Sequence, residues 1–198
     1  MNYNPKVRST YKALVDAIIP YTPQLAVEQG IIQAEGGLYA HIDEYLIWSL
    51  DHFFFNVPLA SPTAELLDIA ANQLIAMGAV KESLNPVAFP HGVTFASLSR
   101  EDRLKAITLL EQLRINLENL PFPYQNNPIF IQQIADALNR FTQFGYYSEW
   151  SGYGVTRFTP SGNRKLENIP LSWKQVRYPG RAHRYHALRG YLVDQFTE

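Results

Sequence analysis

Histidines and carboxylates are the residues of this sequence whose types and spacing are compatible with catalysis or metal binding. His183 and His186 are three residues apart, so both would lie on one face of a helix and could bind a metal ion together. The neighbouring side chains of Arg181, Arg184 and Arg189 are cationic and oppose a divalent metal. The sequence contains no cysteine, which excludes thiolate ligands and a cysteine nucleophile. We therefore expect no metal site in this chain.

A second candidate group for acid–base chemistry surrounds two other histidines. His41 and His52 are close in sequence to the carboxylates Asp43, Glu44 and Asp51. The sequence has no phosphate-binding loop, no GxSxG, HExxH or EF-hand motif, and no Glu three residues before a His, the spacing that di-iron bundles use. We expect neither a catalytic residue nor a cofactor in this chain. A helical enzyme that uses these two histidines or the His183/His186 pair is the alternative.

Charge is distributed unevenly along the chain, although its formal net value is −1. Residues 157–190 contain eight basic side chains and one acidic side chain, whereas residues 1–156 contain nine basic and fifteen acidic side chains. The basic residues are Arg157, Arg164, Lys165, Lys174, Arg177, Arg181, Arg184 and Arg189. This segment is expected either to pack on the acidic body of its own domain or to bind an acidic partner surface. A nucleic-acid binder that stacks bases on the aromatic residues of the segment is a further alternative.

Apolar residues recur at helical spacing in most of the chain, and helix start and stop signals flank them. Ser61-Pro62, Ser99 and Asn127-Pro128 are typical helix starts, while Gly78 and Gly145 are typical stops. Helices are expected over residues 11–18, 38–55, 61–78, 99–120, 127–145 and 185–196. Residues 146–182 lack this period and combine Gly, Pro and Ser with seven aromatic residues, which predicts an irregular aromatic segment. The fold class is therefore all-α, an irregular bundle of about five to seven helices in one domain over residues 1–198.

The composition and the N-terminus indicate a soluble protein. Of the 198 residues, 46% are hydrophobic and 18% are charged, which is far from the composition of disordered chains. Every apolar run ends well before the ~20 residues that a membrane-spanning helix needs. No signal peptide or twin-arginine leader is evident, so we expect a cytoplasmic location, or an extracytoplasmic one only if a partner carries the export signal.

Three segments resemble the small (third) subunit family of gluconate 2-dehydrogenase. They are Leu14-Val15-Asp16-Ala17-Ile18-Ile19-Pro20 with Thr22-Pro23, then Phe95-Ala96-Ser97-Leu98-Ser99, and then Tyr147-Ser148-Glu149-Trp150-Ser151-Gly152-Tyr153-Gly154 with Trp173, Tyr178-Pro179-Gly180 and Tyr185. The resemblance implies a non-catalytic accessory subunit that binds and stabilises the large subunit of a flavin-dependent sugar or alcohol dehydrogenase of the GMC type. The FAD is then expected in that partner. Many members of the family carry a twin-arginine leader, which this sequence lacks.

The irregular segment is the expected partner interface. Tyrosine, tryptophan and arginine are enriched at the centres of protein interfaces, and the segment is rich in all three. The candidate interface residues are Trp150, Tyr153, Trp173, Tyr178 and Arg181. The competing interpretation is that these aromatic side chains form the core of this domain itself.

Overall fold

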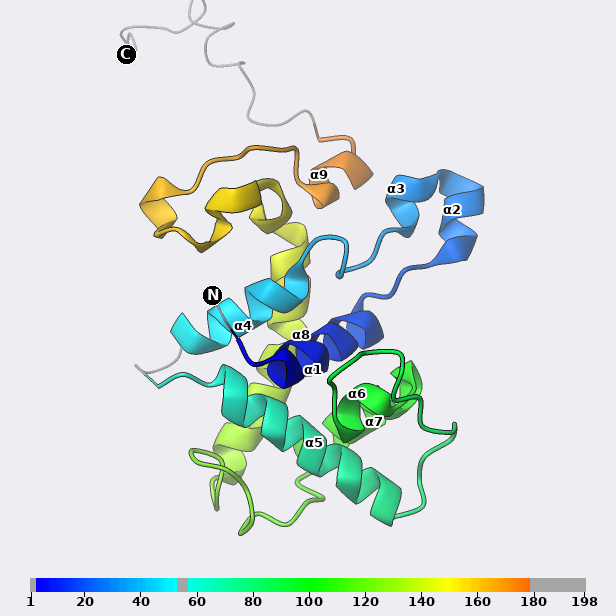
Figure 1. The fold of residues 1–198 in the computed structure, drawn as a ribbon, viewed down its shortest axis with the longest axis vertical. Helices are drawn as coiled ribbons and strands as arrows, with labels where there is room; N and C mark the ends of the chain where they lie inside the picture. Colours follow the sequence, from blue (N-terminus) through cyan, green and yellow to red (C-terminus); the bar gives the residue numbers. More distant parts are fainter. Residues whose placement is uncertain (1–2, 53–56, 179–198) are drawn as a thin grey trace, which may run out of the picture.

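All regular secondary structure is helical in residues 3–52 and 57–178, the part of the chain that the computed structural model describes. Five helices with eleven or more residues build the body of the molecule (Figure 1). They are α1 (Pro5–Ile18), α4 (Ile42–His52), α5 (Ala60–Ala76), α7 (Arg100–Glu111) and α8 (Pro128–Tyr147). The prediction of an all-α irregular bundle is confirmed.

Four short helices and three 3-10 turns complete the described part of the chain. The short helices are α2 (Pro23–Gln29), α3 (Ile31–Ala34), α6 (Thr94–Ser97) and α9 (Leu171–Gln175). The 3-10 turns span Trp150–Gly152, Gly154–Phe158 and Ser161–Asn163. These short helices have only four to seven residues, too few to establish a helical period in the sequence. They raise the helix count of the described residues to nine, above the predicted five to seven.

Helix α1 lies at the centre of the bundle and contacts α4, α5, α6, α7 and α8 (Figure 1). Pro5 occupies its first turn, and the Asn4 side chain accepts a hydrogen bond from the Lys6 amide at 2.9 Å. Its apolar face packs into the core, with Tyr11, Leu14 and Val15 fully inaccessible to solvent. Because every major helix packs around α1, the buried side chains of the described residues form one continuous core.

A buried arginine joins α7 to α1 and α6. The Arg103 side chain, 4% exposed, forms an ion pair with Asp16 at 3.1 Å. It also donates hydrogen bonds to the carbonyl oxygens of Ala13, Phe95 and Ala96 at 3.2, 3.4 and 2.9 Å. Such a charge is tolerated in the interior because its donors are paired. Asp16 and Phe95-Ala96 belong to two of the segments that carry the family resemblance, so these segments hold the helices together.

Several predicted helix boundaries are confirmed by local hydrogen bonds. Ser99 caps α7 by accepting a hydrogen bond from the Asp102 amide at 3.3 Å, and Asn127 caps α8 through the Phe130 amide at 3.2 Å. Gly78 ends α5 with a φ of +64°, a left-handed conformation that glycine adopts at little cost.

Other predicted boundaries are wrong, and a hydrogen bond or a backbone conformation accounts for two of them. Helix α5 begins at Ala60, one residue before the predicted cap Ser61, because the Asp51 side chain accepts a hydrogen bond from the Ala60 amide at 2.8 Å. Helix α7 ends at Glu111 instead of near residue 120, since Leu113 is left-handed with a φ of +54°. Helix α4 begins at Ile42, not at residue 38.

Gly145 was predicted to end the fifth helix, but α8 continues through it to Tyr147. A β-carbon at position 145 would lie 2.3 Å from Cδ1 of Tyr45, so the missing side chain makes room for the Tyr45 ring. Glycine at this position is therefore required by the packing of α8 against α4. The predicted C-terminal helix over residues 185–196 lies outside the described residues.

Candidate partner-binding surface

Exposed apolar side chains concentrate on two stretches of the chain. Of the eighteen large hydrophobic residues that are exposed in the described structure, ten lie within residues 21–39 and 147–178. These ten are Tyr21, Val27, Ile31, Ile32, Tyr39, Tyr147, Val155, Ile169, Val176 and Tyr178. Val27 and Val155 are 89% and 86% exposed, so they gain nothing from the core of this chain. We call this set the α3–α9 surface.

The two stretches meet at α3 and α9, which lie beside each other at one end of the molecule (Figure 1). The Gln33 side chain donates to the Gln175 carbonyl oxygen at 2.7 Å, and the Gln175 side chain donates to the Ile32 carbonyl oxygen at 3.0 Å. The Tyr146 hydroxyl donates to the Glu35 carbonyl oxygen at 2.7 Å. These bonds connect α3, α9 and the end of α8, so they fix the positions of these helices relative to one another.

A cavity of about 500 Å³ opens between the start of α4 and the segment from residue 148 to 178. Its wall combines apolar side chains with polar and cationic ones. It is lined by Leu38, Tyr39, His41, Ser151, Gly154, Arg157, Asn168, Ile169, Leu171 and Lys174. Tyr39 and Ile169 belong to the α3–α9 surface and are 55% and 59% exposed. The cavity is therefore a concave part of that surface, and Lys174 in its wall is a cation without an ion pair within the described residues.

Trp150, one of the predicted interface residues, is part of the core. Its side chain is 1% exposed, and its indole N–H donates a hydrogen bond to the His41 carbonyl oxygen at 3.0 Å. Its ring packs edge-on against Tyr45 and Phe158, with centroid separations of 5.2 and 5.7 Å. A ring enclosed in this way has no surface left for a partner, which corrects the interface assignment for Trp150. The competing interpretation, that the aromatic residue belongs to the core, holds here.

The other predicted interface residues differ in their placement. Tyr153 is half-buried and donates its hydroxyl hydrogen to Glu149 at 2.9 Å. Trp173, also half-buried, packs edge-on against Tyr178 at 4.9 Å between ring centroids, and Tyr178 is 47% exposed. Tyr178 thus belongs to the α3–α9 surface, and Trp173 packs against it. Arg181 lies outside the described residues.

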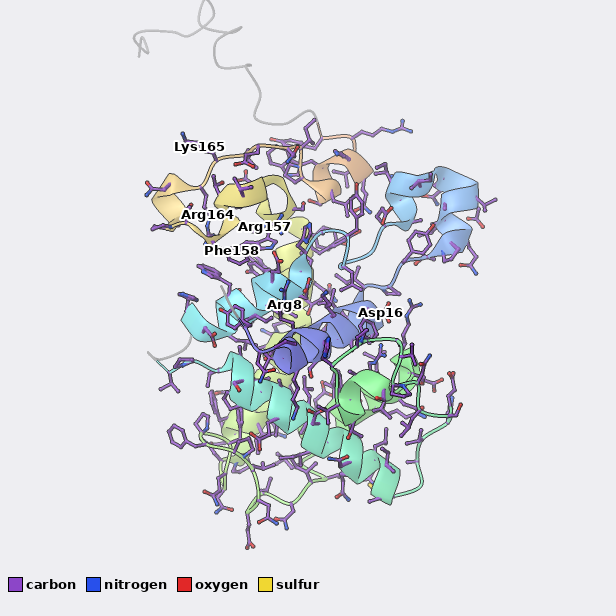
Figure 2. All side chains as sticks on the ribbon, in the orientation of Figure 1. Arg8, Asp16, Arg157, Phe158, Arg164 and Lys165 are labelled. Carbon is purple, nitrogen blue, oxygen red and sulfur yellow. The ribbon has the colours of Figure 1, made fainter. Side chains whose placement is uncertain are left out.

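Two arginines of the basic segment pack on the body of the same domain. Arg157 pairs with Glu44 of α4 at 2.8 Å, and its side chain is only 11% exposed. The guanidinium of Arg164 lies over the Trp48 ring, 4.3 Å from its centroid, and donates to the Thr159 carbonyl oxygen. Figure 2 shows Arg157, Phe158 and Arg164 together above α4. For these two residues, the expectation that the basic segment packs on its own domain is confirmed.

Three further cations of the segment have no such role within the described residues. The side chains of Lys165, Lys174 and Arg177 form no ion pair there. All three are exposed or half-exposed and lie in the same stretch as Ile169, Val176 and Tyr178. The part of the segment that faces solvent is therefore cationic as well as apolar.

The histidines considered for chemistry do not converge in the described structure. His41 lines the 500 Å³ cavity and has a left-handed φ of +56°, and its carbonyl oxygen accepts the Trp150 hydrogen bond. His52 is exposed, stacks on Trp48 and bonds to the Trp48 carbonyl oxygen at 2.7 Å through Nδ1. His183 and His186 lie outside the described residues. No group of three or more His, Cys, Asp or Glu side chains in residues 3–52 and 57–178 is arranged to hold a metal ion.

The sequence reasoning missed the residues that α2 and α3 contribute to this surface. No helix is predicted over residues 21–35, although Thr22-Pro23 is a helix-start signal of the kind used for the longer helices. That signal would have located α2. In the structure none of the residues of α2 is buried, and only Leu25 and Ala26 are partly covered.

Comparison of the chain with protein-family models, curated proteins and solved structures returned no match. Among the helices of the described residues, none combines the length and apolar character that crossing a membrane requires.

Proposed function

We propose that this protein is a non-catalytic accessory subunit that binds and stabilises the FAD-containing large subunit of a flavin-dependent sugar or alcohol dehydrogenase. The observation that carries the proposal is the α3–α9 surface: ten of the eighteen exposed hydrophobic side chains of the described residues lie in two stretches that hydrogen bonds join at α3 and α9. Monomeric proteins leave single apolar residues exposed everywhere, but a concentration of this kind marks an interaction site. The sequence resemblance supplies the identity of the partner.

The chemistry of the surface indicates what the partner presents. Tyr39, Trp173 and Tyr178 offer aromatic area of the kind that carries most binding energy at interfaces. Lys174 and Arg177 lie in the same stretch as Tyr178, and neither forms an ion pair within the described residues. The matching face of the large subunit is therefore expected to combine apolar area with acidic side chains.

The test uses two isoleucines with the same exposure. Ile31 of α3 and Ile129 of α8 are both 67% exposed, but only Ile31 belongs to the α3–α9 surface. The full chain carries an affinity tag and is co-expressed with the large subunit of a flavin dehydrogenase of the GMC type, and the complex is purified through the tag. The double variant Ile31→Ser/Tyr178→Ser should lose about 2 kcal/mol or more of binding free energy, which is a roughly thirtyfold lower affinity for the large subunit. The melting temperature of this chain should change little.

Ile129→Ser is the matched control and should leave both the complex and the melting temperature unchanged. Stoichiometric FAD in the purified complex identifies the partner as a flavoprotein. Equal recovery of the flavoprotein with all variants would refute the assignment of the surface. Failure of the wild-type chain to retain any flavoprotein would refute the proposed partner.

A further inference from the structure

A second cavity is lined by basic side chains from two segments far apart in sequence. It has a volume of about 420 Å³ and lies between the start of α1 and the loop that precedes α6. Arg8, Lys12 and His91 lie in its wall, together with Phe89 and Pro90. Arg8 and Lys12 are four residues apart on α1, so both side chains project from the same face of that helix.

Carboxylates lie close to this cavity, but none forms an ion pair with Lys12 within the described residues. Glu44 lies 3.5 Å from Arg8 but is bound more closely, at 2.8 Å, by Arg157. Asp43 is buried and interacts electrostatically with both Arg8 and Lys12. A third carboxylate, Asp51, is hydrogen-bonded to Tyr3 of the cavity wall. Within the described residues, neither Lys12 nor His91 forms an ion pair.

The loop that carries His91 is held in place on both sides. The Ser9 hydroxyl donates a hydrogen bond to the Pro90 carbonyl oxygen, which attaches the loop to α1. On the other side, a β-carbon at Gly92 would lie 2.3 Å from Cβ of Ala96, so the loop is in close contact with α6. His91 itself has a left-handed φ of +66°, an unfavourable conformation for a residue other than glycine. These contacts hold the backbone of residue 91 beside the cavity.

We propose that this cavity binds a small phosphomonoester, with the phosphate between Lys12, Arg8 and His91 and an apolar or aromatic body against Phe89 and Pro90. Cationic donors converging from two elements suit a doubly charged tetrahedral anion, which accepts several hydrogen bonds at once. The apolar wall adds affinity for the organic part of the ligand, because ligand sites combine a few polar groups with a mainly apolar lining. The site is separate from the α3–α9 surface and does not depend on the function proposed above.

Phenyl phosphate is the probe, and its affinity for the full chain is measured by calorimetry beside inorganic phosphate, benzoate and phenol. The wild-type protein should bind phenyl phosphate more tightly than any of the other three compounds. Lys12→Gln and His91→Gln should each weaken binding roughly fivefold or more, the effect of losing one charge-assisted contact at a partly exposed site. Both side chains are exposed, so the melting temperature should not fall.

Lys165→Gln removes the same charge from an exposed lysine remote from this cavity and should leave the affinity unchanged. Equal weakening by Lys165→Gln would show that binding depends only on net charge and would overturn the proposed site. Equal affinity for benzoate and phenyl phosphate would overturn the assignment to phosphomonoesters. No detectable binding of phenyl phosphate by the wild-type chain would overturn the proposal as a whole.

Discussion

Replacing Trp150 by alanine tests whether the segment after α8 is part of the core. The indole ring is 1% exposed and packs against Tyr45 and Phe158. A buried tryptophan removes about 200 Å² from water, which corresponds to about 5 kcal/mol at about 25 cal/mol per Å². Truncations of this kind usually cost about 3 to 5 kcal/mol of unfolding free energy. We expect Trp150→Ala to lower the unfolding free energy by about 4 kcal/mol.

The measurement is urea unfolding followed by far-ultraviolet circular dichroism. With a denaturant dependence of about 2 kcal/mol per molar urea, the midpoint should fall by about 2 M. Trp150→Phe separates packing from hydrogen bonding, because it keeps a ring in the core but leaves the His41 carbonyl oxygen without its donor. That variant should cost about 1 to 3 kcal/mol.

Val155→Ala is the control within the same segment. Val155 is 86% exposed, so its truncation should change the unfolding free energy by less than about 0.5 kcal/mol. A decrease in unfolding free energy below about 1 kcal/mol for Trp150→Ala would show that Trp150 is not part of the core. Removal of a ring that packs against Tyr45, Trp48 and Phe158 must leave a cavity and lower the stability more than that.

Two further changes probe the packing and the electrostatics of the bundle. Gly145→Ala should lower the unfolding free energy by about 1 to 3 kcal/mol, measured by the same urea titration. The reason is that the added β-carbon would lie 2.3 Å from Cδ1 of Tyr45 and collide with that ring. Unchanged stability would contradict the tight contact of α4 with α8. Burial by itself raises the pKa of the Asp102 carboxyl, which is fully buried. Hydrogen bonds have the larger, opposite effect and hold that pKa below its ordinary value. Their donors are the side chains of Lys105 and Ser99 and the amides of Lys81 and Glu82. A carboxyl with a lowered folded-state pKa stabilises the protein above its unfolded pKa of about 3.9 and loses this effect as the pH falls through the folded-state value. Asp102→Asn should therefore reduce the melting temperature at pH 7, and its difference from the wild type should shrink as the pH falls through the folded-state pKa. A difference independent of pH would contradict this role of Asp102.

Local signals in the sequence were sufficient for the fold class and for most long helices. Ser99 and Asn127 cap their helices through amides three residues ahead, and Gly78 ends α5 through its own φ angle. The buried stripes of α1, α7 and α8 follow from the helical repeat of apolar residues. These features depend on atoms within one or two turns of chain, so the sequence by itself determines them.

The division of the aromatic segment into core and surface was decided only by the tertiary structure. Trp150 is buried because its indole reaches the His41 carbonyl oxygen, 109 positions away, whereas Tyr178 in the same segment remains exposed. The α3–α9 surface exists because Gln33 bonds to Gln175 across 142 positions and brings two separate stretches together. Both outcomes depend on contacts between distant parts of the chain. Residue type and local spacing carry no information on such contacts, since an aromatic side chain fits a core and an interface equally well.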